Sequence, residues 1–344
     1  MRLVLAGFGV VGQSFANLLA EERRTLASSY GLVPRLVAVV DSTGCVVDEG
    51  GLDVAKLVAG KRKNGSVGAR AASEAGATTA QIIRDIEADV MVETTPTEFR
   101  TGEPGLSHIR AAFGSKKSVI TCNKGPLGIA FHALRELARH NSVQFRYSGA
   151  VGGGTPVLDF GRTCSIGDEI TKVTGILNGT CNFILTRMER DRLDFAQALE
   201  LAKREGYAEA DPSLDVNGFD SAVKLAIIAN HLGLSRATVR DVKVAGIAEI
   251  SPERLARAAE KGTAVRLVAT ADGPRLSVEP TVVPRDDPLC ISGPFNAVKF
   301  HCAHSGPKVI VGKGAGGPET ASSLLRDLIE IRGSIGEGAG TTAP

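Results

Sequence analysis

Short apolar runs alternate with amphipathic stretches over roughly the first 150 residues, and the runs have the length of buried strands. Five such strands are predicted, at Leu3–Ala6, Leu36–Val40, Val90–Glu93, Val119–Thr121 and Val143–Tyr147. The amphipathic stretches predict helices up to about residue 24 and at 78–87, 105–113 and 127–139. Strands that alternate with helices of this length are typical of an α/β fold with a doubly wound parallel sheet.

The pattern changes after the loop at 151–156. Strands are predicted beyond it at 171–177, 264–271, 276–283, 295–301 and 308–311, and helices at 195–205, 219–232, 252–261 and 322–331. Strands and helices in this less regular order indicate an α+β domain. We therefore predict a first domain made of residues 1–148 and about 306–333, a second at 149–305, and a tail at 334–344.

Composition and charge fit this picture and exclude several classes of protein. A chain of 344 residues with 43% hydrophobic residues is long enough for two domains. A net charge of +2 gives no case for binding nucleic acid or a membrane surface, and the basic cluster 61–63 is interpreted as a solvated loop. No apolar run approaches the ~20 residues that span a bilayer. The six cysteines lack CxxC spacing, so we expect reduced thiols and a cytoplasmic protein.

A glycine-rich turn follows the first predicted strand and opens the first helix, with the spacing GxGxxG. The first glycine permits the tight turn, the second lets a pyrophosphate approach the backbone, and the third permits close packing of helix and strand. The helix N-terminus then faces the phosphates. The sequence therefore predicts a Rossmann-type site for NAD or NADP. The predicted contacts in this turn are Gly7, Phe8, Gly9, Val10, Val11 and Gly12.

The end of the second predicted strand bears on the choice between the two cofactors. Asp41 is placed to bind the hydroxyls of an adenosine ribose, which favours NAD, although it lies farther from the glycine turn than the usual ~20 residues. An ordinary turn aspartate is the alternative. Ser42, Thr43 and Lys56 are candidates to receive the 2′-phosphate of NADP. The choice of cofactor stays open at this point.

Two further segments directly follow predicted strands. In a parallel sheet, ligands bind beyond the carboxyl ends of the strands. In the loop after Val90–Glu93, the hydroxyls of Thr94 and Thr95 are predicted to contact nicotinamide and Pro96 to fix the loop; a plain turn is the alternative. The segment after the next strand places Lys124 on a rigid loop, where we expect it to reach a substrate carbonyl. A solvated lysine is the alternative there.

The segment Gly206–Lys224 packs one glutamate, three aspartates and a lysine into 19 residues. Asp220 and Lys224 are four apart on a predicted helix and therefore share one face. An exposed pair of this kind contributes only a few tenths of a kcal/mol, but the neighbouring positions 222–228 are almost all apolar, which indicates burial. Desolvation lowers the pKa of a lysine, so that Lys224 would exchange a proton near neutral pH. Asp211 precedes a proline and is expected to shape the turn.

Thiol attack on an aldehyde is a rival mechanism. Cys122 and Cys181 are its candidates, but neither has a neighbouring histidine to activate it, and small buried cysteines are common. His301 and His304 have no metal-ligand partners in the sequence, so core or surface positions are the preferred interpretation.

Taken together, these segments resemble the homoserine dehydrogenase family over about residues 1–333. The matching segments are 7–12, 93–97, 101–105, 121–126, 147–156, 175–185, 206–224 and 312–322, of which the last four are long and specific. The chain is similar to short, monofunctional members that lack a C-terminal regulatory domain. The resemblance implies reversible, NAD(P)-dependent reduction of L-aspartate 4-semialdehyde to L-homoserine in threonine, methionine and isoleucine biosynthesis.

The resemblance also implies roles for individual residues and for the two domains. Lys124 and Lys224 would face the reacting oxygen, Glu209 and Asp220 would hold the substrate, and Asp215 would assist. Further implied contacts are Tyr207, Gly179 and Thr180 with the substrate, and Gly314, Glu319 and Lys124 with the cofactor. The first domain would bind the dinucleotide, and the second would bind substrate and form a homodimer.

The chain departs from the family pattern at a site for a monovalent cation. Family members commonly have a glutamate where this chain has Ser148, so a sodium ion would depend on the backbone oxygens of Val151, Gly153 and Thr155. Cys122 replaces the usual alanine before Asn-Lys. Two other functions stay open: a dehydrogenase for another short amino-bearing aldehyde, and a nicotinamide-binding regulator that has lost catalysis.

Overall fold

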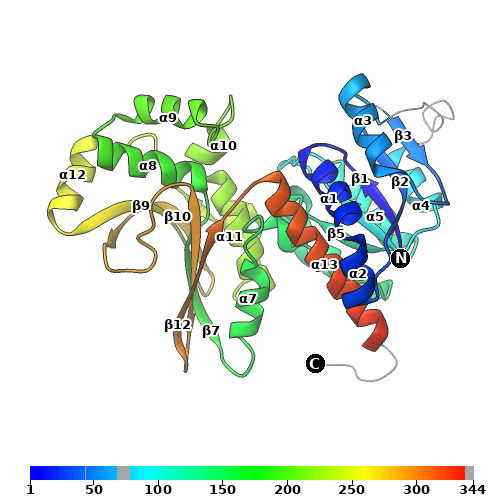
Figure 1. Ribbon diagram of the computed structural model, residues 1–344. Helices are drawn as coiled ribbons and strands as arrows, with labels where there is room; N and C mark the ends of the chain where they lie inside the picture. Colours follow the sequence, from blue (N-terminus) through cyan, green and yellow to red (C-terminus); the bar gives the residue numbers. More distant parts are fainter. Residues whose placement is uncertain (43, 68–77, 338–344) are drawn as a thin grey trace. The chain divides into compact units, whose positions relative to one another are not determined.

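The computed structural model describes residues 1–42, 44–67 and 78–337 of the chain (Figure 1). The chain divides into two compact units, one of Met1–Ala150 together with Gly316–Pro344 and the other of Val151–Ala315. Each unit is built on its own six-stranded sheet. Thr43 and residues 338–344 of the predicted tail lie outside the described residues.

The sheet of the first unit is parallel except at one edge. In spatial order its strands are β3 (Gly44–Val47), β2 (Arg35–Asp41), β1 (Arg2–Ala6), β4 (Val90–Glu93), β5 (Ser118–Thr121) and β6 (Phe145–Arg146). β3 runs antiparallel to β2, whereas the other neighbouring pairs are parallel. The strand order reverses between β1 and β4, so the switch point of this doubly wound sheet lies at the carboxyl ends of those two strands. The predicted α/β fold is confirmed.

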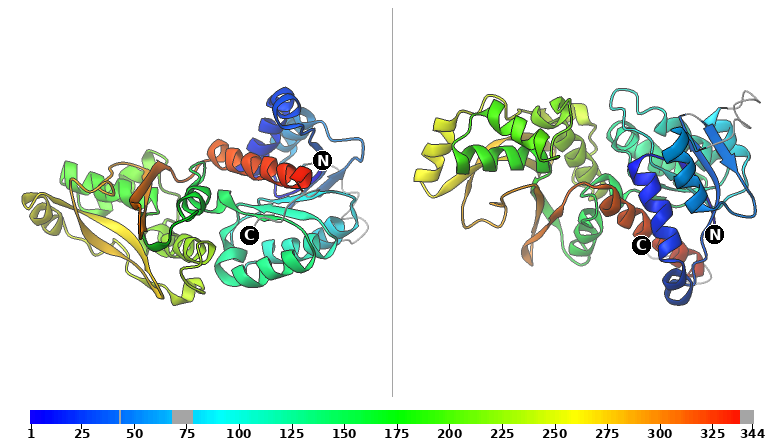
Figure 2. Two further views of the ribbon diagram at one scale, coloured as in Figure 1. Left: turned by 90° about the horizontal axis from the view of Figure 1, so that it is seen from below. Right: turned by 45° about the horizontal axis from the view of Figure 1, so that its top comes forward.

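Helices cover both faces of this sheet because alternate side chains of each strand point to opposite sides. Leu3 and Leu5 of β1 belong to the same apolar cluster as residues of α1 (Val10–Glu21) and α13 (Gly317–Glu337). Val4 and Ala6 belong to a second cluster with residues of α4 (Thr79–Asp85) and α5 (Gly105–Gly114). Figures 1 and 2 show α13 beside α1, although the two helices come from opposite ends of the chain. The remaining helices are α2 (Arg23–Tyr30), α3 (Val54–Asn64), α6 (Lys124–His140) and the 3-10 turn Ser148–Ala150.

Several elements of this unit differ from the sequence prediction. The helix predicted up to residue 24 ends at Glu21, and α2 follows it. The pattern does not predict β3 or α3, because α3 mixes few apolar residues with lysines and an arginine. Residues 61–63 form the last turn of α3 and are not the predicted loop. β6 covers only two residues of the strand predicted at 143–147. The last helix begins at Gly317 and continues to Glu337, so that residues 334–337 of the predicted tail are helical.

The second unit has a mostly antiparallel sheet. In spatial order its strands are β12 (Gly306–Lys313), β11 (Phe295–Cys302), β7 (Ile170–Ile176), β9 (Thr263–Asp272), β10 (Arg275–Pro284) and β8 (Lys243–Val244). β8 runs parallel to β10, and the other neighbouring pairs are antiparallel. The five long strands match the predicted ones to within two residues at nearly every end. The predicted α+β organisation of this part of the chain is therefore present.

Four helices of the second unit lie against its long strands, and the other two pack on those helices (Figures 1 and 2). The helices of this unit are α7 (Val157–Cys164), α8 (Gly179–Asp191), α9 (Phe195–Arg204), α10 (Ser213–Val216), α11 (Phe219–His231) and α12 (Pro252–Glu260), with a 3-10 turn at Val239–Asp241. α11 is buried from Asp220 to Asn230, as its apolar composition predicts. The pattern misses α7, α8 and α10. Within the described ranges, no helix is long and apolar enough to cross a bilayer.

Candidate functional site

The glycine turn between β1 and α1 is closely packed at two positions and open at a third. A Cβ atom on Gly7, whose φ is +95°, would lie 2.6 Å from the backbone of Thr94, and one on Gly12 would lie 2.3 Å from the Gly7 carbonyl oxygen. A Cβ atom on Gly9 would meet nothing within 4 Å. Gly9 is the N-cap of α1, and its helix has no side-chain cap. This arrangement fits a dinucleotide pyrophosphate, which would approach the backbone at Gly9 and face the N-terminus of α1.

The apolar residues of this turn differ in what they can offer to a ligand. Val10 is 73% exposed at the start of α1, and Val11 is half-buried. Phe8 is buried in the apolar core, and its carbonyl oxygen accepts a hydrogen bond from Gln13 Nε2 at 3.1 Å. Phe8 therefore anchors the turn, and Val10 and Val11 present the surface next to it.

Asp41, at the end of β2, is engaged by a lysine that the sequence interpretation places in solvent. Lys61 Nζ on α3 lies 2.6 Å from Asp41 Oδ2, and the Asp41 side chain is only 5% exposed. Ser42 is exposed, and Lys56 forms a long, exposed contact of 3.7 Å with Asp53. The Lys61 ammonium therefore offsets the charge of Asp41 at the strand end where the adenosine ribose is predicted to bind.

The loop after β4 is tied to the glycine turn and to the start of α6. Thr94 Oγ1 donates a hydrogen bond to the Gly7 carbonyl oxygen at 2.8 Å. Asn123 Nδ2 donates to the carbonyl oxygens of Thr95 and Pro96 at 3.3 and 3.4 Å. These contacts bring three segments that are far apart in the sequence to one edge of the sheet, at its switch point.

The sequence pattern predicts that Lys124 lies on a loop, but the residue is the first of α6. Asn123 caps the helix by accepting a hydrogen bond from the Gly125 N–H at 3.0 Å. The Gly-Pro pair that follows the lysine favours a loop in the sequence, but proline is tolerated in the first turn of a helix, where its missing N–H has no helical partner. Lys124 is half-buried. Its backbone is held by a helix end next to the β5 carboxyl terminus.

A buried polar cluster occupies the N-terminal half of α11 in the second unit. Lys224 Nζ lies 2.8 Å from Asp220 Oδ2 and donates a hydrogen bond to the Leu177 carbonyl oxygen at 2.8 Å. The side chains of Lys224 and Asp220 are 8% and 12% exposed. The predicted i,i+4 pair is therefore buried and is not an ordinary surface ion pair. Burial makes removal of either partner costly, because the other charge then loses a partner that lies close to it in a region with little solvent.

Asn178 joins the carboxylates of this cluster and is missing from the predicted site. Its Nδ2 donates to Asp215 Oδ1 at 2.6 Å and to Asp220 Oδ2 at 3.0 Å. Its Oδ1 accepts from the Cys181 N–H and caps α8. An asparagine before Gly-Thr at the start of a helix is an N-cap signal that sequence reasoning could have used.

Asn296 of β11 is a second residue that the sequence analysis misses. It is 4% exposed, and its Nδ2 donates to the same Leu177 carbonyl oxygen that accepts from Lys224, at 3.1 Å. A Cβ atom on Gly314 would lie 1.9 Å from this nitrogen, so glycine is required there for packing. Gly314, predicted as a cofactor contact, thus packs against Asn296, which shares the Leu177 carbonyl oxygen with Lys224. No local pattern signals Asn296, since its hydrogen-bond partner Leu177 lies 119 positions away in the chain.

The other predicted substrate contacts lie near the ends of α8 and α9. Thr180 Oγ1 donates to the Tyr207 carbonyl oxygen at 2.6 Å, and Gly179 packs against Pro294. Tyr207 is 41% exposed, and Glu209 is exposed. The structure therefore brings Asp215, Asp220 and Lys224 into one cluster and places Glu209 in solvent. The predicted turn role of Asp211 is confirmed, because its carboxylate accepts the Ser213 N–H at 3.1 Å.

The two cysteines considered for thiol catalysis are in environments that disfavour the thiolate. Burial and the nearby Glu93 raise the pKa of Cys122 to about 12. Burial, together with the carboxylates of Asp215 and Asp220, raises the pKa of Cys181 well above its ordinary value. Because the thiolate is the nucleophile, neither side chain is suited to attack an aldehyde near neutral pH.

The residues of the predicted cation site contribute no side-chain carboxylate. The Thr155 carbonyl oxygen accepts a hydrogen bond from the Val157 N–H at 2.8 Å, and the buried Ser148 donates its N–H to Asp327 at 3.0 Å. Among the described residues, no group of three or more histidine, cysteine, aspartate or glutamate side chains is arranged to hold a metal. Sodium binding through Val151, Gly153 and Thr155 stays a prediction, and no catalytic step is derived through it.

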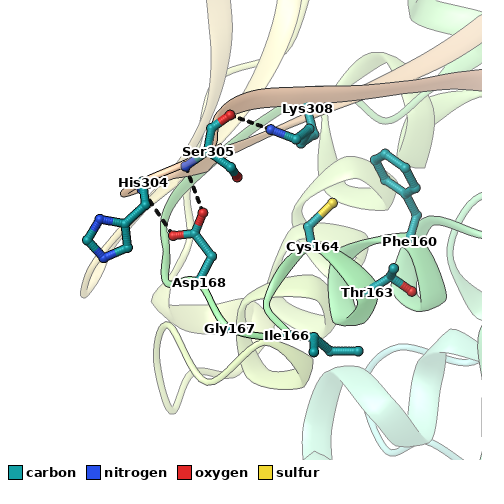
Figure 3. Close-up of a pocket in the computed structure, with 9 residues that line it drawn as sticks. All are labelled: Phe160, Thr163, Cys164, Ile166, Gly167, Asp168, His304, Ser305 and Lys308. Atoms are coloured by element: carbon teal, nitrogen blue, oxygen red, sulfur yellow. Dashed lines mark hydrogen bonds between the residues drawn. The ribbon is translucent and has the colours of Figure 1, made fainter.

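A surface cavity of about 570 Å³ in the second unit lies elsewhere, between the end of α7 and the β11–β12 turn (Figure 3). None of the predicted site residues lines it. Figure 3 shows Asp168 turned toward the turn, where its carboxylate accepts the N–H groups of His304 at 3.1 Å and Ser305 at 2.8 Å. This carboxylate therefore closes the β11–β12 turn.

The Asp168 contacts predict an acid-dependent stability. Hydrogen bonds from Ser305 and His304 hold the pKa of Asp168 well below its ordinary value of 3.8. A carboxylate with a depressed pKa in the folded state stabilises the protein above its ordinary pKa and loses that contribution as the pH falls. The melting temperature of wild type should therefore fall more steeply than that of Asp168→Asn below about pH 4. Parallel curves for the two proteins would contradict this role.

Comparison with known protein families adds to this geometry. The family model of homoserine dehydrogenase matches residues 156–329, and that of glutamate/leucine/phenylalanine/valine dehydrogenase matches residues 1–97. A homoserine dehydrogenase of Methanocaldococcus jannaschii is 40% identical over 97% of this chain and 99% of its own. An NAD(+)-dependent homoserine dehydrogenase of Pseudomonas canavaninivorans is 39% identical over 97% of this chain and 96% of its own.

Solved structures give the same result. A crystal structure assigned to the homoserine dehydrogenases, from Archaeoglobus fulgidus, has a TM-score of 0.88 and 39% identity, and it covers 96% of this chain and 99% of its own. A hyperthermophilic archaeal homoserine dehydrogenase in complex with NADPH has a TM-score of 0.82 and 25% identity, and it covers 97% of this chain and 98% of its own. The resemblance seen in the sequence is thereby confirmed.

Proposed function

Because the chain belongs to the homoserine dehydrogenase family of oxidoreductases, we propose that it reversibly reduces L-aspartate 4-semialdehyde to L-homoserine with NADH or NADPH. The observation that carries this proposal is the buried cluster around Lys224. An ammonium group has three N–H donors. The Leu177 carbonyl oxygen and Asp220 engage two of them, which leaves the third for a substrate oxygen.

The lysines would handle the proton of the reaction. When bound, the reduced nicotinamide supplies a hydride to the aldehyde carbon, and the oxygen that becomes an alkoxide needs a proton. Lys224 would donate it, and Lys124 would stabilise the developing negative charge. Lys224 is fixed by two contacts before substrate arrives, so little reorganisation is needed at the moment of reaction. Thr94, Thr95 and Pro96 would contact the cofactor, as would Gly314 and Glu319.

The carboxylates would select an amino-bearing substrate. Asp215 and Asp220 bring two carboxylates together beside Lys224, and carboxylates suit a substrate ammonium group. Glu209 is exposed nearby in the sequence and would add a third carboxylate to the substrate contacts. Tyr207, Gly179 and Thr180 would complete the substrate contacts. A simple hydroxy acid would need an arginine in place of these carboxylates.

Turnover of aspartate semialdehyde by the purified protein tests the proposal directly. We expect oxidation of NADH or NADPH that depends on aspartate semialdehyde, and the reverse reaction with homoserine. A protein that binds cofactor but turns over no aldehyde would instead be a regulator. Faster turnover of another short amino-bearing aldehyde would assign a different substrate. Sedimentation of the same protein at micromolar concentration tests the proposed homodimer, which a monomer would contradict.

The Lys61–Asp41 pair predicts that loss of Lys61 shifts the cofactor preference from NADPH toward NADH. Lys61→Ala would remove the ammonium that offsets the charge of Asp41, and the carboxylate would then repel the 2′-phosphate of NADPH more strongly. We expect NADPH affinity to fall about tenfold relative to NADH affinity, which corresponds to about 1.4 kcal/mol. Binding titrations with both reduced cofactors measure this ratio. Lys63→Ala removes an exposed lysine of the same helix turn and should change the ratio less than about twofold. Equal losses for both cofactors in Lys61→Ala would contradict the prediction.

A further inference from the structure

Glu93 is a fully buried acidic residue to which the proposed reaction gives no role. It is the last residue of β4 and is 0% exposed. Its strand neighbours are Ala6 at the end of β1 and Thr121 at the end of β5. Glu93 therefore lies at the switch point, where a doubly wound sheet takes its ligand.

The groups around the Glu93 carboxylate are neutral hydrogen-bond donors. Oε1 accepts the Thr95 N–H at 2.9 Å and the Thr95 hydroxyl. Oε2 accepts the Thr121 hydroxyl at 2.9 Å. The Thr121 hydroxyl oxygen itself accepts the Asn123 N–H at 3.0 Å, so its proton is directed to the carboxylate. Burial raises the pKa of Glu93 above its ordinary value, and hydrogen bonds from Thr95, Thr121 and Asn123 offset only part of this rise. This donor set fits the ionised form.

The same contacts connect the two segments that are assigned to the cofactor and to the first lysine. Thr95 belongs to the loop whose hydroxyls are expected to meet nicotinamide. Thr121 and Asn123 hold the end of β5 and the cap of α6, which Lys124 begins. Removing the carboxylate would loosen both segments at once, because its two oxygens join them.

We propose that Glu93 is a positioning residue of the cofactor site, and that its ionised carboxylate also favours oxidised over reduced nicotinamide. The oxidised ring carries a positive charge and the reduced ring carries none. A buried anion whose hydrogen-bond donors are neutral attracts a cation more strongly than an exposed anion does, since the low local dielectric screens it less. This inference rests on the proposed binding of NAD(P) at the switch point and deepens it.

The test uses the purified full-length protein without substrate and measures the dissociation constants of NAD⁺ and NADH by calorimetric titration. If wild type binds NADP(H) more tightly, that pair replaces NAD(H). In Glu93→Gln the shape is kept, the side-chain oxygen can still accept from Thr95, and the amide can donate to the Thr121 hydroxyl. We expect the ratio of the NAD⁺ constant to the NADH constant to rise about tenfold, equivalent to about 1.4 kcal/mol. A rise of less than about twofold would overturn the charge argument.

Two further variants separate charge from structure. Glu93→Asp keeps the charge and shortens the side chain, so the ratio should stay within about twofold of wild type even if the melting temperature falls. A rise of about tenfold in Glu93→Asp would overturn the proposal, and this ratio can be measured even if Glu93→Gln fails to fold. Thr121→Val removes one donor to Glu93 and should weaken both cofactors together. Wild-type protein that binds neither cofactor would overturn the proposed function itself, whereas normal binding with an unchanged ratio overturns only this inference.

Discussion

Replacing Lys224 by methionine is expected to lower kcat/KM for aspartate semialdehyde by about a thousandfold, within the range found for general acid–base groups. Methionine has a similar length but no proton to donate, and it leaves the Leu177 carbonyl oxygen and Asp220 without the ammonium that they share. Cofactor affinity should change little, because the residues assigned to the dinucleotide lie mainly in the glycine turn and the loop after β4. Steady-state rates and NADH titration measure the two effects separately.

Loss of stability is the main competing explanation for that result. Lys224→Met removes the ammonium beside the buried Asp220 carboxylate, and breaking a buried pair costs about 3–5 kcal/mol. The double variant Asp220→Asn with Lys224→Met removes both charges and should recover most of this stability without recovering activity. Lys203→Met, which alters a lysine paired at the surface with Glu200, is the matched control and should retain wild-type rates. Recovery of turnover in the double variant would contradict a chemical role for Lys224.

The sequence predicts those features that depend on neighbouring residues in the chain. The period of apolar residues locates most strands of both sheets, and the largely apolar composition of α11 correctly indicates that Asp220 and Lys224 are buried. The glycine spacing predicts a turn whose packing the structure accounts for at Gly7 and Gly12. In each of these cases the deciding interactions are local or depend only on burial.

The features that the sequence misses depend on contacts between distant residues. Asn296 meets the Leu177 carbonyl oxygen across 119 positions of the chain. Lys61 meets Asp41 only because α3, which the pattern does not predict, returns to the end of β2. Glu93 gains its donors from the ends of two strands. A side chain whose partners come from another element carries no periodic signal of its function, and so the cluster around Lys224 could be predicted only in part.

Alanine substitutions in the glycine turn are expected to have different effects at its two positions: Gly12→Ala should lower stability, whereas Gly9→Ala should lower cofactor affinity. Gly12→Ala would place a Cβ atom 2.3 Å from the Gly7 carbonyl oxygen, and overpacking of this kind costs about 1–3 kcal/mol. Gly9→Ala adds a methyl group where no atom lies within 4 Å, and φ at Gly9 is −78°, which alanine adopts without strain. Its stability should therefore fall by less than about 1 kcal/mol, the usual difference between these residues at an N-cap.

In cofactor binding the order of the two variants should reverse, because Gly9→Ala should lose more NADH affinity than Gly12→Ala. The methyl group of Gly9→Ala would occupy the space through which the pyrophosphate approaches the backbone. We expect its NADH affinity to fall about thirtyfold, equivalent to about 2 kcal/mol, while its melting temperature without cofactor stays close to wild type. Gly12→Ala should melt earlier without cofactor, and its NADH affinity should fall less than that of Gly9→Ala. Thermal unfolding and NADH titration on both proteins measure this crossing pattern. If Gly9→Ala bound NADH as tightly as wild type, the pyrophosphate would have to lie elsewhere, and the helix N-terminus of α1 would lose its assigned ligand.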